Sequence, residues 1–278
     1  MAEVHHFSYG WINPVFAYAL SFLGSLLGLV LATRSRESRG AGRARWLTLS
    51  ALAIGGTGVW LAHFMALLGF DVPSMTMRYD LSTTVLGFGI AFVALCFGLY
   101  LVGFGTPKAW KIIVAGVPTG VGVAAAHYTG TLALRLQGVV QFDAVRVGLT
   151  VVVAIVASTV TLWFVAVIRG ASGTVIAAAT MALASVSTHY TSMSAVRVLQ
   201  VPAVVGTAGV PPFVLLIPVC VLACLMISGL AYSTVGFSLR DNTPHEEALL
   251  ATARSMHVTH AGPPSQPADR IPIGPGQR

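Results

Sequence analysis

Three histidines lie inside otherwise apolar stretches of the sequence: His63, His127 and His189. They follow one another at intervals of 64 and 62 residues, so they recur with a nearly constant period. An ionisable side chain within a hydrocarbon-like segment is costly to bury, and neutral imidazole is a common metal ligand. The pattern therefore makes the three histidines candidate metal ligands. The competing interpretation is that each one only hydrogen-bonds across helices and holds the fold together.

Sulphur-bearing side chains extend the candidate set. Met193 follows His189 by four residues, so on a helix both side chains lie on one face and can reach one ion. Imidazole together with a thioether suits copper better than it suits hard cations. Further candidate ligands, each with a more ordinary role as a packing or terminal residue, are Met65, Met75, Met77, Cys220, His5 and His6.

The composition is that of an integral membrane protein. Of 278 residues, 55% are hydrophobic and only 9% are charged, whereas about a quarter of a soluble globular chain is charged. The net charge of +7 would suit a nucleic-acid binder, but five of the sixteen basic residues fall in one stretch, 34–45, which contains no aromatic residue. Such a stretch is typical of contact with the anionic face of a bilayer, and nucleic acid is excluded as a partner.

Windows of apolar residues predict an all-α membrane protein with seven transmembrane helices. Positive charges concentrate in the odd-numbered loops, which predicts that the N-terminus lies outside and the C-terminus in the cytoplasm. Residues 1–236 would form one membrane domain, and the proline-rich stretch 237–278 a disordered cytoplasmic tail. The predicted spans are Pro14–Thr33, Trp46–Gly69, Leu81–Phe104, Ala109–Leu134, Ala144–Ile168, Thr174–Val196 and Pro212–Gly236.

Each histidine opens a similar short segment, and the segments read HFMAL from 63, HYTGT from 127 and HYTSM from 189. A period near 63 residues accommodates two spans, so the seven helices would be three two-helix repeats plus one. This arrangement places all three histidines near the outer ends of alternate helices. Asp80 and Asp143 follow their histidines by 17 and 16 residues, where we expect them to cap the next helix. Whether the histidines form one site or three is left open.

The spacing and the residues around the three histidines resemble the MHYT domain, a bacterial integral-membrane sensor module, over about residues 5–235. The resemblance implies a location in the bacterial cytoplasmic (inner) membrane and a metal site, with copper favoured, at His63, His127 and His189. It also implies sensing of a diatomic gas or a redox signal, which a cytoplasmic or membrane signalling partner would read. The residues before the three histidines are Ala62, Ala126 and Thr188, where the family motif has methionine.

The leading hypothesis is accordingly a non-catalytic membrane sensor. No paired carboxylate lies in the predicted spans and no nucleotide-binding motif is visible, so the sequence gives no sign of an enzyme. The alternatives are a transporter for a metal ion or a small molecule, a haem protein with two histidines as axial ligands, and a structural bundle that assembles with a separate signalling protein.

Overall fold

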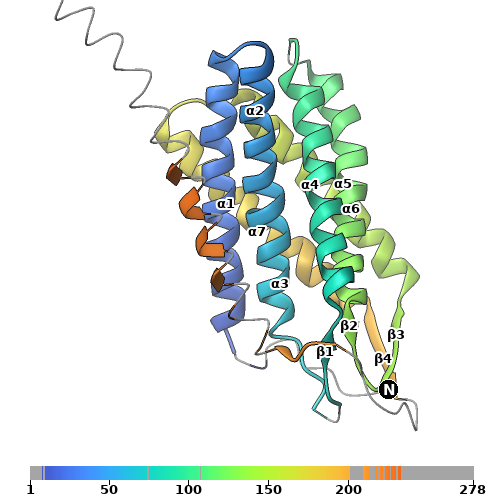
Figure 1. The fold of residues 1–278 in the computed structure, drawn as a ribbon. Coiled ribbons are helices and arrows are strands. Elements are labelled where there is room, and N and C mark those ends of the chain that lie inside the picture. The colour runs from blue at the N-terminus through green and yellow to red at the C-terminus, as the bar shows by residue number, and fades with distance from the viewer. Residues whose placement is uncertain are drawn as a thin grey trace, which may run out of the picture. The chain divides into compact units, whose positions relative to one another are not determined.

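The computed structural model describes residues 8, 10–73, 75–106, 108–200 and 209–212, together with scattered positions between 214 and 232. In this part the chain forms a bundle of six long helices with short antiparallel strands at one end (Figure 1). All six are long and apolar enough to cross a membrane, which agrees with an all-α membrane fold. They are α1 Ile12–Glu37, the continuous helix α2–η1–α3 (Gly40–Ala51, Leu52–Leu61 and Ala62–Leu67), α4 Leu81–Gly103, α5 Ala109–Leu132, α6 Ala144–Val167 and α7 Ala171–Ser194.

Most of the predicted spans agree with the helices to within four residues, but the first connection does not. The arginine-rich stretch was expected to be a loop, whereas α1 runs to Glu37 and α2 already begins at Gly40. Arg34 and Arg36 therefore lie in the last turn of α1, where the partial negative charge of the helix end favours cations. A charged helix end looks like a loop to a search for apolar windows, and this explains the error.

The predicted seventh span falls largely outside the described residues. Between 212 and 232 the described positions are all helical. The predicted tail, 237–278, lies wholly outside the described part, as do His5 and His6.

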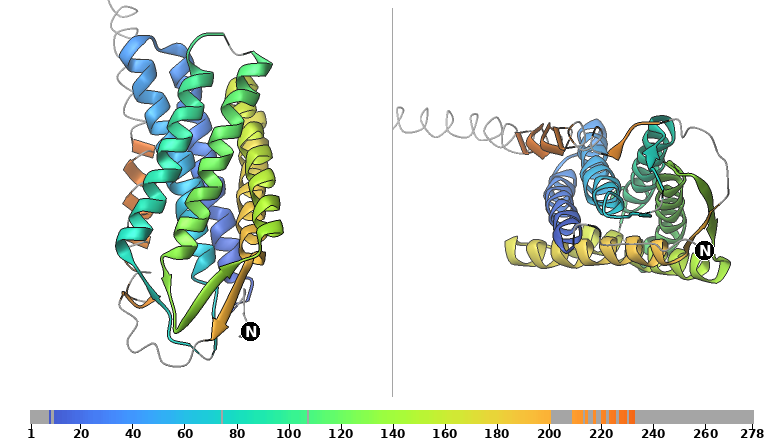
Figure 2. Two further views of the ribbon diagram at one scale, coloured as in Figure 1. Left: turned by 90° about the vertical axis from the view of Figure 1, so that its right-hand side faces the viewer. Right: turned by 90° about the horizontal axis from the view of Figure 1, so that it is seen from below.

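The six helices form a closed ring in which neighbours in sequence are neighbours in space. Each long helix packs on the next one, and α1 completes the ring by packing on α7 (Figure 2). The α2–η1–α3 helix is the most enclosed. In its apolar 18-residue stretch, 78% of the residues are buried, against 28–44% in the corresponding stretches of the other five helices. The others expose large apolar side chains, as expected for helices that face lipid. The helix that carries His63 is thus held on several sides.

Glycines allow this enclosed helix to approach α1 closely. A methyl group at Gly24 of α1 would lie 2.5 Å from the backbone nitrogen of Gly58 and 2.7 Å from the carbonyl oxygen of Ala53. Small residues let helix backbones meet where lipid supplies no hydrophobic force between helices. The segment η1, directly before His63, is a π-helix, a rare form that is often found at functional sites.

Short strands tie the helices together at the end of the bundle that carries the histidines. β1 (Arg78–Tyr79) pairs with β2 (Leu134–Arg135), and β3 (Gly138–Phe142) pairs with β4 (Val196–Gln200), both antiparallel. None of these strands was predicted. Short strands next to a membrane span extend its apolar run, so residues near 134 and 196 were counted with the helices.

The same arrangement of a helix-capping aspartate occurs twice at this end of the bundle. Asp80 caps α4 by accepting a hydrogen bond from the backbone N–H of Thr83, and Asp143 caps α6 through the N–H of Arg146. The prediction that both aspartates are helix caps is confirmed. The backbone N–H of Asp80 donates to the carbonyl of Ala133, and that of Asp143 donates to the carbonyl of Ala195. Each cap thereby fixes the start of one helix against the end of the helix that follows it in the chain.

The contact between α1 and η1 can be tested with two glycines in helix interiors. Gly24→Ala should lower the free energy of unfolding by about 1–3 kcal/mol, because the added methyl group meets rigid backbone. Gly89→Ala in α4 is the matched control, since a methyl group there meets nothing within 4 Å. That control should be neutral or stabilising because alanine has the higher helix propensity. Unfolding in mixed detergent micelles measures both, and equal effects would contradict the close contact.

The cap of α4 predicts a particular pH dependence. Hydrogen bonds from the hydroxyl and backbone N–H of Thr83, and then from Ser82, lower the pKa of Asp80 from 3.8 to about 2. A lowered pKa means that the cap contributes its full stability above pH 4 and loses it as the pH falls towards 2. Carboxyl NMR of labelled protein should show this midpoint, and Thr83→Val should raise it. A midpoint near 4 in the unaltered protein would refute the assignment.

Candidate metal centre

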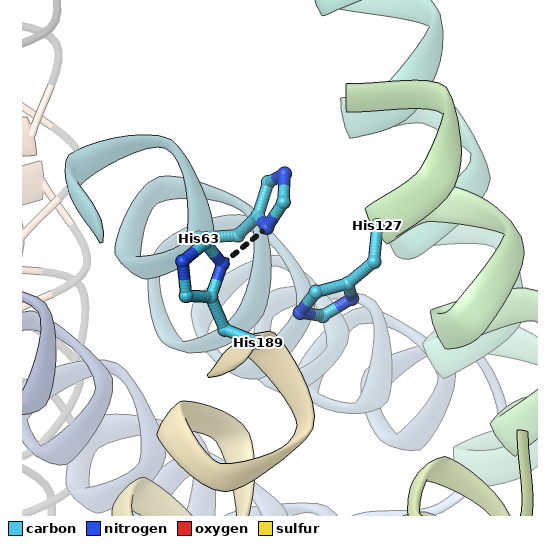
Figure 3. Close-up of side chains that lie close together, drawn as sticks. All are labelled: His63, His127 and His189. Carbon is cyan, nitrogen blue, oxygen red and sulfur yellow. Dashed lines mark hydrogen bonds between the residues drawn. The ribbon is translucent and has the colours of Figure 1, made fainter. Parts of the chain in front are cut away.

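The three predicted histidines meet at one point inside the bundle. His63 lies on α3, His127 on α5 and His189 on α7, and their rings face one another between these helices (Figure 3). Their exposed fractions are only 3%, 1% and 3%. One donor nitrogen from each ring lies within 4.8 Å of the others. The question that the sequence left open is therefore answered: the histidines form one cluster.

Two hydrogen bonds fix the orientation of the rings. The Nδ1 atoms of His63 and His189 lie 2.9 Å apart, so one ring donates to the other. Nδ1 of His127 lies 2.9 Å from the carbonyl oxygen of Val123, one turn earlier on α5. The ring centroids of His63 lie 4.5 Å from His127 and 4.9 Å from His189. His63 is thus the central member of the cluster.

The bond to Val123 settles where His127 carries its proton. A carbonyl oxygen can only accept, so Nδ1 of His127 must be the donor and Nε2 of the neutral ring keeps its lone pair. Nε2 of His127 is buried and has no hydrogen-bond partner among the described residues, and the same is true of Nε2 of His63. Buried polar atoms of this kind call for an explanation, and an absent ion or water is a common one.

A glycine in α5 makes room for the central ring. A methyl group at Gly130 would lie 2.6 Å from Nε2 of His63 and 3.0 Å from its Cδ2 atom. A side chain at this position would force the imidazole of His63 to shift. Sequence reasoning did not assign Gly130 a role. The available signal was a glycine inside a helix, one turn after a candidate ligand.

Met193 is the predicted sulphur ligand that the structure places beside the cluster. It lies on α7 one turn after His189 and is 1% exposed. Its Sδ atom is 4.0 Å from the hydroxyl of Thr131, which donates to the backbone carbonyl of His127. Met65 is half-buried and follows His63 by two residues, and side chains at that spacing on a helix do not face each other.

The other candidate sulphur ligands lie elsewhere. Met75 is buried in an apolar cluster with Phe70, Tyr79 and Val198, and the partly buried Met77 packs against it. The side chain of Cys220 is exposed. The contacts of these residues are those of packing and surface positions.

A small cavity adjoins the cluster. It measures about 30 Å³ and is lined by His127 and by side-chain hydroxyls, which include Ser21, Ser25 and Thr188. One water needs roughly 10–15 Å³, so the cavity has room for about two waters or one small molecule. A cofactor site normally offers about 300 Å³ or more. This cavity is therefore far smaller than a haem site.

Comparison with protein-family models shows which family the chain belongs to. The repeat described as the N-terminal repeat of bacterial signalling proteins, MHYT, matches twice in succession, at residues 56–116 and 120–179. The chain belongs to the MHYT family. The first match includes His63 and the second includes His127, and the MHYT repeats begin 64 residues apart, close to the period of the histidines.

Three curated relatives are signalling proteins. The chain is 31% identical over 195 residues to the bifunctional diguanylate cyclase/cyclic di-GMP phosphodiesterase MucR of Pseudomonas aeruginosa, a match that covers 68% of this chain and 28% of MucR. It is 30% identical to an uncharacterized signaling protein of Caulobacter vibrioides, over 66% of this chain and 22% of that protein. It is 33% identical to the cyclic di-GMP phosphodiesterase NbdA of Pseudomonas aeruginosa, over 57% of this chain and 21% of NbdA.

The chain therefore matches less than a third of the length of each of these relatives. No solved structure matches it. What the comparisons show is an MHYT membrane domain related to those of signalling proteins, while the activities in the relatives' names are theirs.

The tautomer of His127 can be tested on the metal-free protein. Nitrogen NMR of protein with labelled histidines should find the proton of His127 on Nδ1, because that atom faces the carbonyl of Val123. Free neutral histidine prefers the other tautomer in water, so the signal is diagnostic. Free histidine in the same buffer serves as the reference, and a proton on Nε2 of His127 would contradict the geometry.

Proposed function

We propose that this protein is a membrane sensor that binds a copper ion through His63, His127 and His189, with Met193 as an additional ligand. The observation that carries the proposal is the convergence of three buried imidazoles from three helices, with donor nitrogens within 4.8 Å of one another. Burying three ionisable side chains in an apolar bundle costs free energy, and this cost favours a functional role for the cluster. Two of its members, His63 and His127, also lie in the matched MHYT repeats.

The residues present fit a copper ion. Imidazole nitrogens bind such a metal at about 2.0 Å, so nitrogens that share one ion lie at most about 4 Å apart. Small rotations of the three rings would satisfy that limit from the 4.8 Å seen here. The lone pair on Nε2 of His127 is already available. A thioether beside imidazoles favours copper over Mg²⁺ or Ca²⁺. When bound, copper would supply a redox-active centre that can also take a diatomic ligand.

If both rings bind through Nδ1, the proton between His63 and His189 would have to move to Nε2 of the ring that now donates it. The hydrogen bond that now joins α3 to α7 would then be replaced by bonds to the ion. A ligand shifts a conformational equilibrium only by its different affinity for the two states, and this exchange of bonds is such a difference. The rearrangement would move α3, α5 and α7 relative to one another.

We place the histidine end of the bundle outside and the opposite, arginine-rich end in the cytoplasm of a bacterial inner membrane. The support is the excess of basic residues in the connections at that end. A movement of α7 would then reach the cytoplasmic side, where a signalling partner could read it. The relatives MucR and NbdA carry cyclic di-GMP activities in their names, and a partner of that class is part of the proposal.

The proposal predicts one copper ion per chain in protein purified in mild detergent. All three cysteines should first be changed to serine, so that thiols do not contribute. In that background His63→Gln, His127→Gln and His189→Gln should each weaken Cu(I) binding by about 100-fold or more, because each removes a ligand. Competition with a coloured Cu(I) chelator measures the affinity.

Two methionine variants provide the matched comparison for that experiment. Met193→Leu should weaken Cu(I) binding, whereas Met75→Leu should leave it unchanged, because the end of the Met75 side chain lies beside Gly138 of β3. Circular dichroism and unfolding of the metal-free variants check that each one is folded. A folded cysteine-free protein that binds no copper, or histidine variants that bind it as well as their parent does, would overturn the proposal.

A further inference from the structure

The end of the bundle opposite the histidines contains a second, larger cavity. It measures about 200 Å³, far more than the roughly 15 Å³ that one water needs. Three arginines from three different parts of the chain line it: Arg36 at the end of α1, Arg43 in α2 and Arg169 after α6. These residues define what we call the arginine pocket.

Backbone carbonyls hold the three guanidinium groups in place. Nη1 of Arg36 and Nη1 of Arg169 both donate to the carbonyl oxygen of Ile168, each at 3.0 Å. Nε of Arg43 donates to the carbonyl of Ser35 at 3.0 Å. Two positive groups thus meet at one oxygen atom, where a bound anion would lower the repulsion between them. Each guanidinium has five N–H donors, and the recorded bonds leave several of them for a ligand.

Carboxylates do not balance this charge in the part of the chain that the structure describes. The recorded ion pair there joins Arg197 to Asp143, at the histidine end of the bundle. The acidic residue nearest in sequence, Glu37, has an exposed side chain on α1 and does not line the pocket. Lys111 adds positive charge at the edge, where its Nζ atom donates to the carbonyl of Phe104 beside the lining residue Gly105.

We propose that the arginine pocket is a binding site for a phosphate group. Arginine matches phosphate because its planar guanidinium can donate two parallel hydrogen bonds to two phosphate oxygens. Three guanidiniums around a cavity of this size can enclose a phosphate together with the group that carries it. Leu47, Val102 and Val165 supply an apolar wall for that carrier. The phosphate comes either from an anionic lipid headgroup or from a soluble phosphate compound.

The site is separate from the proposed copper centre, and its test does not depend on that centre. In the first arm, the full chain in a neutral detergent is titrated with inorganic phosphate, with chloride at equal ionic strength as the reference, and its unfolding temperature is measured. In the second arm, the full chain in phosphatidylcholine nanodiscs with a small fraction of phosphatidylglycerol is released into detergent, and retained lipid is counted by native mass spectrometry.

Arg36→Gln and Arg43→Gln should each weaken phosphate or phosphatidylglycerol binding about tenfold, as expected for the loss of a charge-assisted hydrogen bond. Arg39→Gln is the matched control, because it removes the same charge from the same stretch and Arg39 does not line the pocket. Its binding should stay within about twofold of the unaltered protein. Arg169→Gln changes an exposed side chain and serves if the first two variants do not fold.

The two arms identify the source of the phosphate. Retention of phosphatidylglycerol without an effect of inorganic phosphate supports a lipid headgroup, and the reverse result supports a soluble compound. Displacement of bound phosphatidylglycerol by inorganic phosphate from the unaltered protein would support one shared site. No binding in either arm, or an equal loss in Arg39→Gln and the pocket variants, would overturn the proposal.

Discussion

The burial of three imidazoles in an apolar bundle is the constraint on which the rest of this structure depends. In hydrocarbon an unsatisfied polar nitrogen is costly, so each ring must find a partner inside the protein. His63 and His189 use each other, and His127 uses the backbone of Val123. The first of these bonds joins α3 to α7. The positions of these helices and the hydrogen bonding of the cluster therefore depend on each other.

Close helix contacts make this burial possible. Gly24 lets α1 reach the backbone of η1, and Gly130 leaves space on α5 for the ring of His63. The strand pairs and the capping aspartates Asp80 and Asp143 then hold the helix ends at the same end of the bundle. Small residues inside the bundle and hydrogen bonds at its rim thus act together, because lipid gives helices no hydrophobic reason to associate.

The two ends of the bundle have opposite chemistry. One end holds neutral imidazoles with available lone pairs and a buried thioether at Met193, which suit a soft metal ion. The other end holds the guanidiniums of the arginine pocket, which suit a hard, multiply charged anion. Helices α1 and α7 run between them and pack on each other. The histidine cluster and the arginine pocket are therefore connected by one packed pair of helices.

The sequence by itself determined the membrane class, the positions of six spans, the period of the histidines and the two aspartate caps. These features are local: apolar length, the spacing of like segments and the residue before a helix can all be read along the chain. Only the tertiary structure showed that His63, His127 and His189 converge, that Gly130 leaves room for them, and that Arg36, Arg43 and Arg169 share a cavity. Those features depend on how each helix is rotated about its axis and on pairings between distant residues, which hydropathy and spacing do not encode.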